Sequence, residues 1–383
     1  MIIEKDIQFL SNEVSKIRKA IHRYPETGFK EYKTSEFIKK KLIEYGIDEI
    51  HETAKTGLVG FLQGSIGKKT TAFRSDMDGL PLQEENCIPF KSDKEGFMHA
   101  CGHDGHIAAL LGFVKYAVTH RNAIKDNLVF IFQPAEEGPG GAEVIIKEGV
   151  MEKFKIDRII GMHIFPEYPQ GMIASKPGAL MARNGEVVFK VKGLKAHGAM
   201  PEKGVDAIVA AASLISNLQT IISRSIDPME SAVLTFGKIG GGEAVNVIAE
   251  EVTIGGTLRA FNDDIYDRIV ERIYKIAEGT ETIYGCSIEV DFTHMYQIVN
   301  NDVFLEKALR KAVGQDCYIE SCRFMISEDF SFFQKKVPGL FFFLGCYNKK
   351  RGYIHPLHSS KFDFDDKILL YAIQTYVNLL NEL

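Results

Sequence analysis

Six side chains have the types and spacing of a metal-dependent hydrolytic centre. They are Cys101, His103, Glu136, Glu137, His163 and His358. A thiolate, a carboxylate and three imidazoles form a mixed ligand set that suits zinc, manganese, nickel or cobalt better than magnesium or calcium. Five of these side chains are enough to hold two divalent metal ions, and one carboxylate remains to move a proton.

The adjacent glutamates can divide the work of hydrolysis. Two divalent cations with one thiolate and one glutamate as ligands keep a surplus of positive charge, so a water molecule bound there should ionise readily. One residue of the Glu136–Glu137 pair can bind metal, while its neighbour takes the proton of that water and passes it to the leaving group. The residues therefore predict attack by a metal-activated hydroxide.

The polar residues also follow apolar runs of strand length. Leu128–Phe132 precedes the two glutamates, and Arg158–Met162 directly precedes His163. Thr70–Phe73 precedes another polar string, Arg74–Asp78. In open α/β sheets, sites assemble beyond the carboxyl ends of the strands. We therefore expect these clusters to meet at one edge of a sheet.

Nine strings along the chain resemble the M20 family of metal-dependent amidohydrolases. The likeness is to the branch that contains hippurate hydrolases, N-acetyldiaminopimelate deacetylase and plant auxin-conjugate hydrolases, and it covers essentially the whole chain. The strings are His22–Gly28, Arg74–Pro81, Met98–His106, Phe132–Gly138, Lys195–Pro201, Asn246–Ile248, Gly256–Arg259, Ser327–Phe330 and His358–Phe364.

This resemblance implies how the ligands are shared. Cys101 would bridge the two ions. Glu137 and His358 would complete one metal site, and His103 and His163 would complete the other.

Further roles are implied by the same resemblance. Glu136 would be the general base and acid, and His197 would reach into the site of the opposite subunit to polarise the scissile carbonyl. Asn246 and Arg259 would hold the substrate, because a guanidinium is the best fork for a carboxylate. Without the resemblance, His197 would pass for a surface histidine in a Gly/Pro turn, and Arg259 for half of a surface ion pair.

The chain departs from the family pattern at two places. Ile326 stands where relatives usually have glycine, so its side chain would narrow the acyl pocket or block the approach of the backbone to the substrate. Ala249 stands where proline is usual, which loosens a turn.

At 383 residues the chain is long for one core, and we expect two domains of α/β class. Residues 1–183 and 296–383 would form a discontinuous, mixed α/β catalytic domain that holds the two metal ions. Residues 184–295 would form an inserted, smaller α+β domain of βαββ order, with a long apolar helix at Asp206–Ile222. The resemblance implies that this insertion is a lid and mediates dimerisation.

The composition points to a soluble cytoplasmic protein without a nucleic-acid or membrane partner. The net charge is −5, which gives no general attraction to polyanions. Six cysteines show no framework spacing, so a reduced compartment is expected. Ile3, Ile7, Leu10, Val14 and Ile17 repeat at helical spacing, which predicts an amphipathic helix in place of a signal peptide.

The favoured function is hydrolysis of the amide bond of N-acyl amino acids, with an acetyl or aroyl group, by a homodimer or higher homo-oligomer acting on a small molecule. A dipeptidase or carboxypeptidase on the same scaffold shares the chemistry and stays open. A non-catalytic metal-binding relative stays open as well, although such a protein has no need of Glu136 beside the metal ligands.

Overall fold

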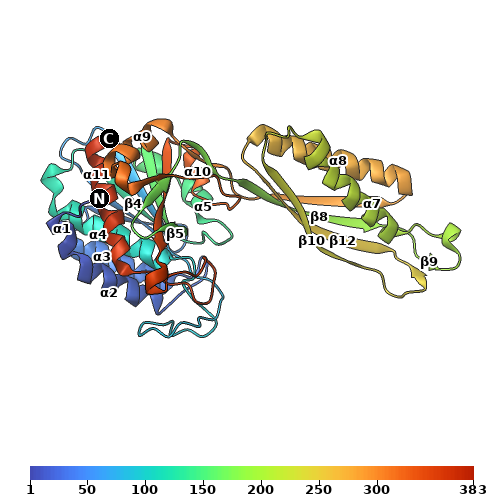
Figure 1. Cartoon of the computed structure of the whole chain (residues 1–383), viewed down its shortest axis with the longest axis horizontal. Helices are drawn as coiled ribbons and strands as arrows, with labels where there is room; N and C mark the ends of the chain where they lie inside the picture. Colours follow the sequence, from blue (N-terminus) through green and yellow to red (C-terminus); the bar gives the residue numbers. More distant parts are fainter. The chain divides into compact units, whose positions relative to one another are not determined.

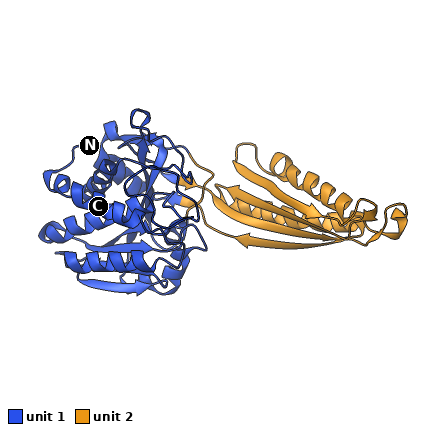
Figure 2. Ribbon diagram, turned by 90° about the horizontal axis from the view of Figure 1, so that it is seen from below, with its two compact units in different colours: residues 1–178, 300–322, 329–383 blue, residues 179–299, 323–328 orange.

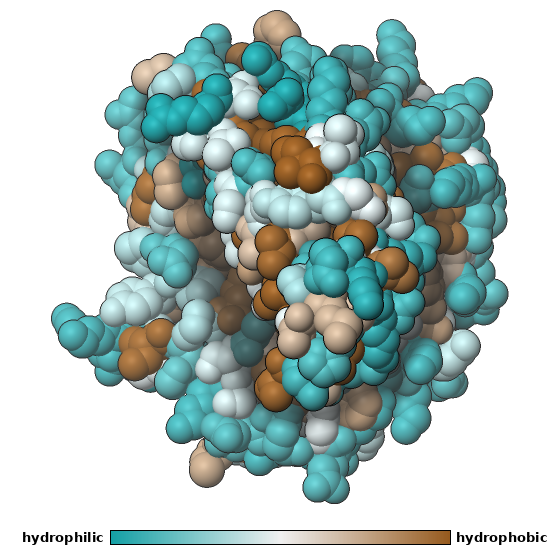
Figure 3. Space-filling model, turned by 90° about the vertical axis from the view of Figure 1, so that its right-hand side faces the viewer, coloured by the Kyte–Doolittle hydropathy of each residue, from teal (hydrophilic) through white to brown (hydrophobic).

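The chain divides into two units in the computed structural model, which describes residues 1–383 (Figures 1 and 2). Unit 1 comprises residues 1–178, 300–322 and 329–383, and unit 2 comprises residues 179–299 and 323–328. The insertion expected at residues 184–295 falls within unit 2. On the face drawn in Figure 3, hydrophilic side chains dominate, and apolar side chains are exposed in small patches among them.

An eight-stranded mixed sheet forms the centre of unit 1. Its strand order is β1-β2-β4-β3-β5-β16-β6-β15. The four middle strands β4, β3, β5 and β16 are mutually parallel, and antiparallel pairs flank them. The strands are β1 Glu49–Thr53, β2 Gly57–Leu62, β3 Thr70–Asp76, β4 Asn127–Gln133, β5 Arg158–Pro169, β6 Ile173–Ser175, β15 Tyr318–Glu320 and β16 Gly339–Tyr347.

Nine α-helices accompany this sheet. They are α1 Lys5–Phe9, α2 Ser11–His22, α3 Tyr32–Tyr45, α4 His103–Thr119, α5 Gly141–Lys147, α6 Val150–Lys153, α9 Val303–Val313, α10 Ser331–Gln334 and α11 Leu369–Glu382. Helix α4 lies against strands β3, β4 and β5 and also contacts α2, α3 and α11. Strand β4 is buried on both faces, as expected for a parallel strand inside an α/β sheet.

Aromatic rings fasten α4 to the sheet. The ring of Phe73 on β3 meets Phe113 of α4 at 4.7 Å and Tyr376 of α11 at 5.1 Å between centroids, both edge to face. All three side chains are buried, and such pairs stabilise beyond the area that they bury. The start of α4 is thereby held at a fixed place relative to the carboxyl ends of the parallel strands.

Unit 2 has its own antiparallel sheet, in the order β10-β12-β8-β13. Its elements are β8 Arg183–Lys192, β9 Ala196–His197, α7 Ala207–Thr220, β10 Ala232–Gly241, β11 Val247–Ile248, β12 Glu251–Ala260, α8 Asp263–Tyr284 and β13 Ser287–His294. Alternate residues of β8, Val187, Phe189 and Val191, join the buried cluster formed with α7 and α8. One face of the sheet is therefore core, as in many antiparallel sheets. A separate two-stranded sheet pairs β7 Gly178–Met181 with β14 Val299–Asn301.

The expected βαββ order is present in unit 2, and α8 and β13 extend it. Helix α7 lies within the predicted Asp206–Ile222, because the Asp206 carboxylate accepts hydrogen bonds from the Ile208 and Val209 amides and caps the helix. By length and hydropathy alone, Ala207–Ser225 could cross a membrane. Of its most apolar window 33% is buried, and those buried residues belong to the core cluster of unit 2.

Three sequence-based expectations differ from the structure. The string Arg74–Asp78 was expected to follow a strand that ends at Phe73, but β3 continues to Asp76. The N-terminal amphipathic segment forms two helices, α1 and α2, with Leu10 between them. His163 was expected to follow a strand that ends at Met162, but it lies inside β5, which continues to Pro169. The strand runs on because β16 keeps pairing with it, whereas the pairing of β3 with β5 ends at Gly161.

Candidate metal centre

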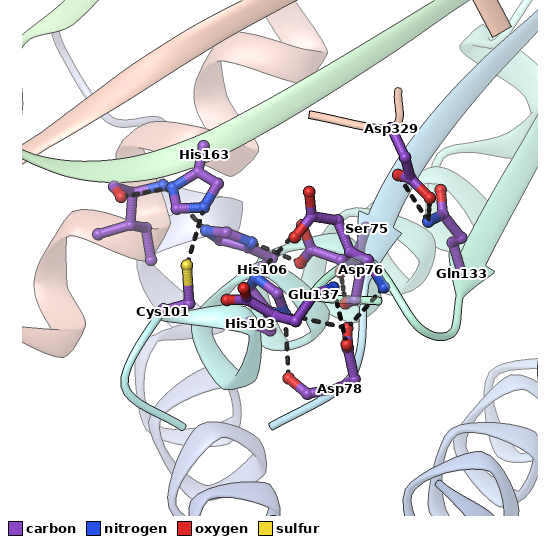
Figure 4. A network of polar contacts seen from close by, with 12 residues as sticks. Ser75, Asp76, Asp78, Cys101, His103, His106, Gln133, Glu137, His163 and Asp329 are labelled. Atoms are coloured by element: carbon purple, nitrogen blue, oxygen red, sulfur yellow. Dashed lines mark hydrogen bonds and ion pairs between the residues drawn. The ribbon is translucent and has the colours of Figure 1, made fainter. Parts of the chain in front are cut away.

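The predicted ligands meet at the carboxyl ends of the parallel strands of unit 1. Figure 4 shows four of them, Cys101, His103, Glu137 and His163. Cys101 stands just before α4, and His103 is the first residue of that helix. Between them Gly102 has φ +90°, in the left-handed region that favours glycine, so the chain turns sharply enough to present both side chains together. Glu137 comes from the loop after β4, and His163 from β5.

Two ligand triads share Cys101. The ligand atoms of Cys101, His103 and His163 all lie within 4.8 Å of one another, and so do those of Cys101, Glu137 and His358. The Cys101 sulfur lies 3.4 Å from His163 Nε2. The five ligands predicted from the sequence therefore come together as one cluster, with the thiol common to both halves.

Backbone carbonyls fix which nitrogen each buried histidine presents. His103 Nδ1 donates to the carbonyl oxygen of Asp78 at 2.9 Å, and His163 Nδ1 donates to the carbonyl oxygen of Ile164 at 2.7 Å. In the neutral form of either ring the lone pair is therefore on Nε2, which is the form that binds metal. His103 Nε2 is buried and has no hydrogen-bond partner, so this nitrogen is suited to a cation.

His358 reaches the cluster from a loop near the C-terminus. Its backbone amide donates to the carbonyl oxygen of Ala100 at 2.9 Å, next to Cys101. It has φ +62°, rare for a residue with a side chain, and its Nε2 lies 3.0 Å from Glu137 Oε1. The side chain is 53% exposed, so this half of the cluster faces solvent more than the His163 half.

Asp78 links the glutamate loop to the His103 helix. Its two carboxylate oxygens accept the backbone amides of Glu136 at 3.1 Å and Glu137 at 3.0 Å, and its carbonyl accepts His103 Nδ1–H. Glu31, also buried, accepts the Ala135 amide at 2.9 Å and holds the same loop from its other side. Ala135 needs this support because its φ is +56°.

The cluster is short of positive charge without a cation. Burial raises the pKa of the Cys101 thiol well above its usual range, and the nearby Glu137 and Glu136 raise it further. Burial would lower the pKa of His103, but Asp76 and Asp78 outweigh it and raise the pKa to about 10. Both shifts favour added protons, so the same acidic surroundings would favour a metal ion in their place.

The donor set fits two divalent cations. It offers a thiol between two triads, imidazole nitrogens oriented by backbone carbonyls, and Glu137 Oε1 beside His358 Nε2. Soft and borderline ligands of this kind suit zinc, nickel, cobalt or manganese.

Unit 2 carries the other three predicted site residues. His197 on β9 pairs with Val247 of β11, and the Asn246 carbonyl accepts the Gly198 amide at 2.8 Å, so His197 and Asn246 are neighbours. His197 is exposed, and its Nδ1 accepts the Ala199 amide at 3.0 Å, which places the ring proton on Nε2.

Arg259 is not brought together with this pair. It lies near the end of β12 opposite Asn184, whereas His197 belongs beyond the other end, where Glu251 pairs with Lys192. Eight residues of strand separate Glu251 from Arg259, or about 27 Å at the usual rise. Arg259 donates to Thr257 Oγ1 at 2.9 Å and forms no salt bridge to a carboxylate.

Sequence reasoning gave no role to three residues that hold the cluster, Asp78, Glu31 and His106. The only available signal for Asp78 was its place after β3. Nothing near Glu31 in the sequence indicated a partner more than a hundred residues away. His106 lies one turn after His103 on α4, with its Nδ1 2.6 Å from Asp76 Oδ1.

Known proteins resemble this chain over nearly its whole length. The profile of peptidase family M20/M25/M40 matches residues 72–382. An N-acetyldiaminopimelate deacetylase of Exiguobacterium sibiricum is 40% identical over 95% of this chain and 96% of its own length. A Staphylococcus aureus structure described as an aminohydrolase has a TM-score of 0.92 at 31% identity, covering 99% of this chain and 98% of its own. A dinuclear metal-binding M20 peptidase of Bacillus subtilis has a TM-score of 0.86 at 30% identity, covering 97% and 98%.

Cobalt should report directly on the sulfur of Cys101. We predict that adding Co²⁺ to the metal-free protein produces an intense near-ultraviolet band from thiolate-to-cobalt charge transfer, because the metal displaces the thiol proton. Cys101→Ser should abolish the band. Cys322→Ser is the matched control, because Cys322 is exposed and lies outside both triads. Retention of the band in Cys101→Ser would exclude Cys101 as a ligand.

Proposed function

This chain belongs to peptidase family M20/M25/M40 and is a hydrolytic enzyme that acts on amide bonds, and we propose a narrower reaction for it. The enzyme would remove the acetyl group of N-acetylated amino acids. The observation that carries the proposal is the pair of ligand triads that share Cys101. N-acetyldiaminopimelate is the first substrate to test, because relatives about 40% identical over most of the chain are deacetylases of that compound.

Each triad would hold one divalent cation. Cys101 would bridge them, His103 and His163 would complete one site, and Glu137 and His358 would complete the other. Zinc, manganese, nickel and cobalt are the ions that this donor set accommodates. When bound, the ions would polarise the amide carbonyl and lower the pKa of a water molecule.

Glu136 would move the proton. Its carboxylate belongs to a group with His103 and Glu137 whose ligand atoms lie within 4.8 Å of one another, yet neither Cys101 triad includes it. Asp78 accepts its backbone amide at 3.1 Å, which holds the loop that carries the side chain. From this place the carboxylate would accept a proton from the attacking water and deliver it to the amide nitrogen as that nitrogen departs.

The partner subunit's lid would complete the site. His197 carries its ring proton on Nε2 and is exposed, so it can donate a hydrogen bond to the oxyanion that forms on the scissile carbonyl. Asn246 would act from the same hairpin end. Arg259, at the far end of the sheet, would bind the substrate carboxylate with a guanidinium that no carboxylate neutralises.

Two features of unit 2 support a homodimer. Strand β10 is an edge strand, with Ile239 60% exposed. Helix α7 carries no charged residue, and Ile208 and Val209 on it are each about half exposed. Uncovered strand edges and apolar helix faces are surfaces on which copies of a chain associate. We expect this homodimer in the cytoplasm, since all six cysteines are free thiols.

Substrate preference tests the proposed reaction. We expect the metal-loaded enzyme to cleave N-acetyldiaminopimelate and other N-acetyl amino acids faster than N-benzoyl amino acids or dipeptides. The reason is Ile326, which is 42% exposed and whose side chain would narrow the acyl pocket where relatives usually have glycine. Free amino acid is measured after each reaction. Faster cleavage of dipeptides would identify a dipeptidase, and Ile326→Gly should shift the preference toward benzoyl groups.

The role of Glu136 predicts a loss of turnover without a loss of metal. Glu136→Gln removes the proton acceptor and keeps every proposed ligand, so kcat should fall by about 10²–10⁴-fold. Two metal ions per chain should remain, as counted by elemental analysis. Glu143→Gln, an exposed carboxylate on α5, is the control and should leave kcat unchanged. Near-normal turnover in Glu136→Gln would exclude the assignment.

Action in trans predicts complementation between two inactive variants. Removing one oxyanion donor typically costs about 3–4 kcal/mol, so His197→Ala should be nearly inactive, like Glu136→Gln. After mixing and verified subunit exchange, the heterodimer should recover activity, because one of its two sites contains both Glu136 and His197. His120→Ala is the control variant and should have wild-type activity. Its mixture with His197→Ala should have no more activity than the His120→Ala protein has alone. If exchange is complete and the first mixture stays inactive, His197 does not act in trans.

A further inference from the structure

His106 lies in the same buried cluster as His103 and His163, but its two nitrogens are both occupied (Figure 4). Its Nδ1 lies 2.6 Å from Asp76 Oδ1, and its Nε2 accepts the backbone amide of Ile164 at 2.9 Å. An amide N–H can only be accepted by a nitrogen that keeps its lone pair. His106 is therefore neutral, with its proton on Nδ1 and donated to Asp76.

This arrangement leaves His106 no lone pair for a metal ion. The ligand atoms of Asp76, His103 and His106 lie within 4.8 Å of one another and would pass for a cation site by spacing alone. Asp76 is also engaged, because its Oδ2 accepts Arg74 Nη1 at 2.8 Å. Arg74 in turn donates to Gln133 and Asp329, at 2.9 Å each. Asp76 thus shares the Arg74 guanidinium with Asp329.

Ile164 donates its backbone N–H to His106 Nε2 at a gap in the sheet. Strand β3 pairs with β5 only as far as Gly161, so it supplies no backbone acceptor for β5 at Ile164. His106 supplies the acceptor from α4 in place of a strand. The carbonyl of the same residue, Ile164, accepts His163 Nδ1–H at 2.7 Å. A continuous chain of hydrogen bonds therefore runs from Asp76 through His106 and Ile164 to His163.

We propose that His106 is a positioning residue, which acts through the backbone of Ile164 to orient His163 toward the metal ion that His163 shares with Cys101. The proposal rests on the role of His163 as a ligand put forward above. Holding Ile164 fixes the carbonyl that takes the Nδ1 proton of His163, and so keeps His163 Nε2 on the side of the Cys101 sulfur, 3.4 Å away. The rings of His106 and His163 also pack together, with centroids 4.6 Å apart at 70°.

Two substitutions of His106 separate this role from a ligand role and from mere packing. In His106→Gln the side-chain oxygen reaches about as far as imidazole Nε2, so it can still accept the Ile164 amide. In His106→Asn the side chain reaches only as far as Nδ1, so it can keep the contact with Asp76 and loses the one with Ile164. His163→Ala provides the reference for loss of the ligand itself.

The measurements are the number and affinity of Co²⁺ ions bound by the full-length protein, from calorimetry, and hydrogen exchange of the peptide that contains Ile164. His163→Ala should bind one ion tightly. In His106→Asn both ions should still bind, but the affinity for the ion that His163→Ala loses should fall by about 10–100-fold. That is the usual effect of losing a group that orients a metal ligand. The Ile164 peptide of His106→Asn should also exchange faster. His106→Gln should restore the affinity and the protection.

Each result has a distinct meaning. If His163→Ala binds two ions with unchanged affinity, the proposed metal centre is wrong. If His163→Ala loses one ion but His106→Asn binds both as tightly as the wild type, only the role of His106 is wrong. Equal loss in the Gln and Asn variants would also overturn it. Should neither variant fold, ¹⁵N spectra of wild-type histidines decide: the proton of His106 on Nδ1, with and without metal, supports the proposal, and direct coupling of His106 to bound ¹¹³Cd²⁺ overturns it.

Discussion

The thiol of Cys101 and the carboxylate of Glu137 lie close together in the cluster. The other residues of the centre are arranged so that protons or cations can balance the negative charge of these two groups when they are ionised. Water reaches the thiol poorly, so burial alone raises the pKa of the thiol. Added protons or metal ions can balance the acidic groups, but only metal ions bring hydrolytic chemistry with them. The carbonyls of Asp78 and Ile164 accept the Nδ1 protons of His103 and His163, so in the neutral rings Nε2 is the nitrogen presented to a cation.

Backbone positions, more than side-chain contacts, define the ligand geometry. Gly102 turns the chain before α4, Ala135 and His358 adopt positive φ, and Asp78 and Glu31 hold the glutamate loop through its amides. Residues held in such conformations cost free energy, and they persist where the surrounding structure over-determines them. The aromatic packing of α4 against β3 provides that rigid surrounding.

The two units differ in strand direction, and this decides where each sheet can gather polar side chains. Parallel strands in unit 1 bring several polar loops to one edge, which suits a multi-ligand centre. In unit 2, Arg259 lies near one end of the four-stranded antiparallel sheet. His197 lies on the separate β9–β11 pair, beyond the other end of that sheet. Because of this separation, we propose a shared role for His197 and Asn246 and a different one for Arg259.

The sequence by itself determined the family and the α/β class and predicted the ligand set, because metal ligands must be chemically specific side chains and their motifs are short and local. Cys101 and His103 are recognisable one residue apart, and Glu136–Glu137 after a strand-like run. It did not place the end of β5 correctly, since the strand is extended past His163 by pairing with β16, a partner almost two hundred residues away. Asp78, Glu31 and His106 also escaped it. Their roles depend on backbone groups of distant segments, and any residue type can supply a backbone amide or carbonyl, so only the tertiary structure decides which ones they meet.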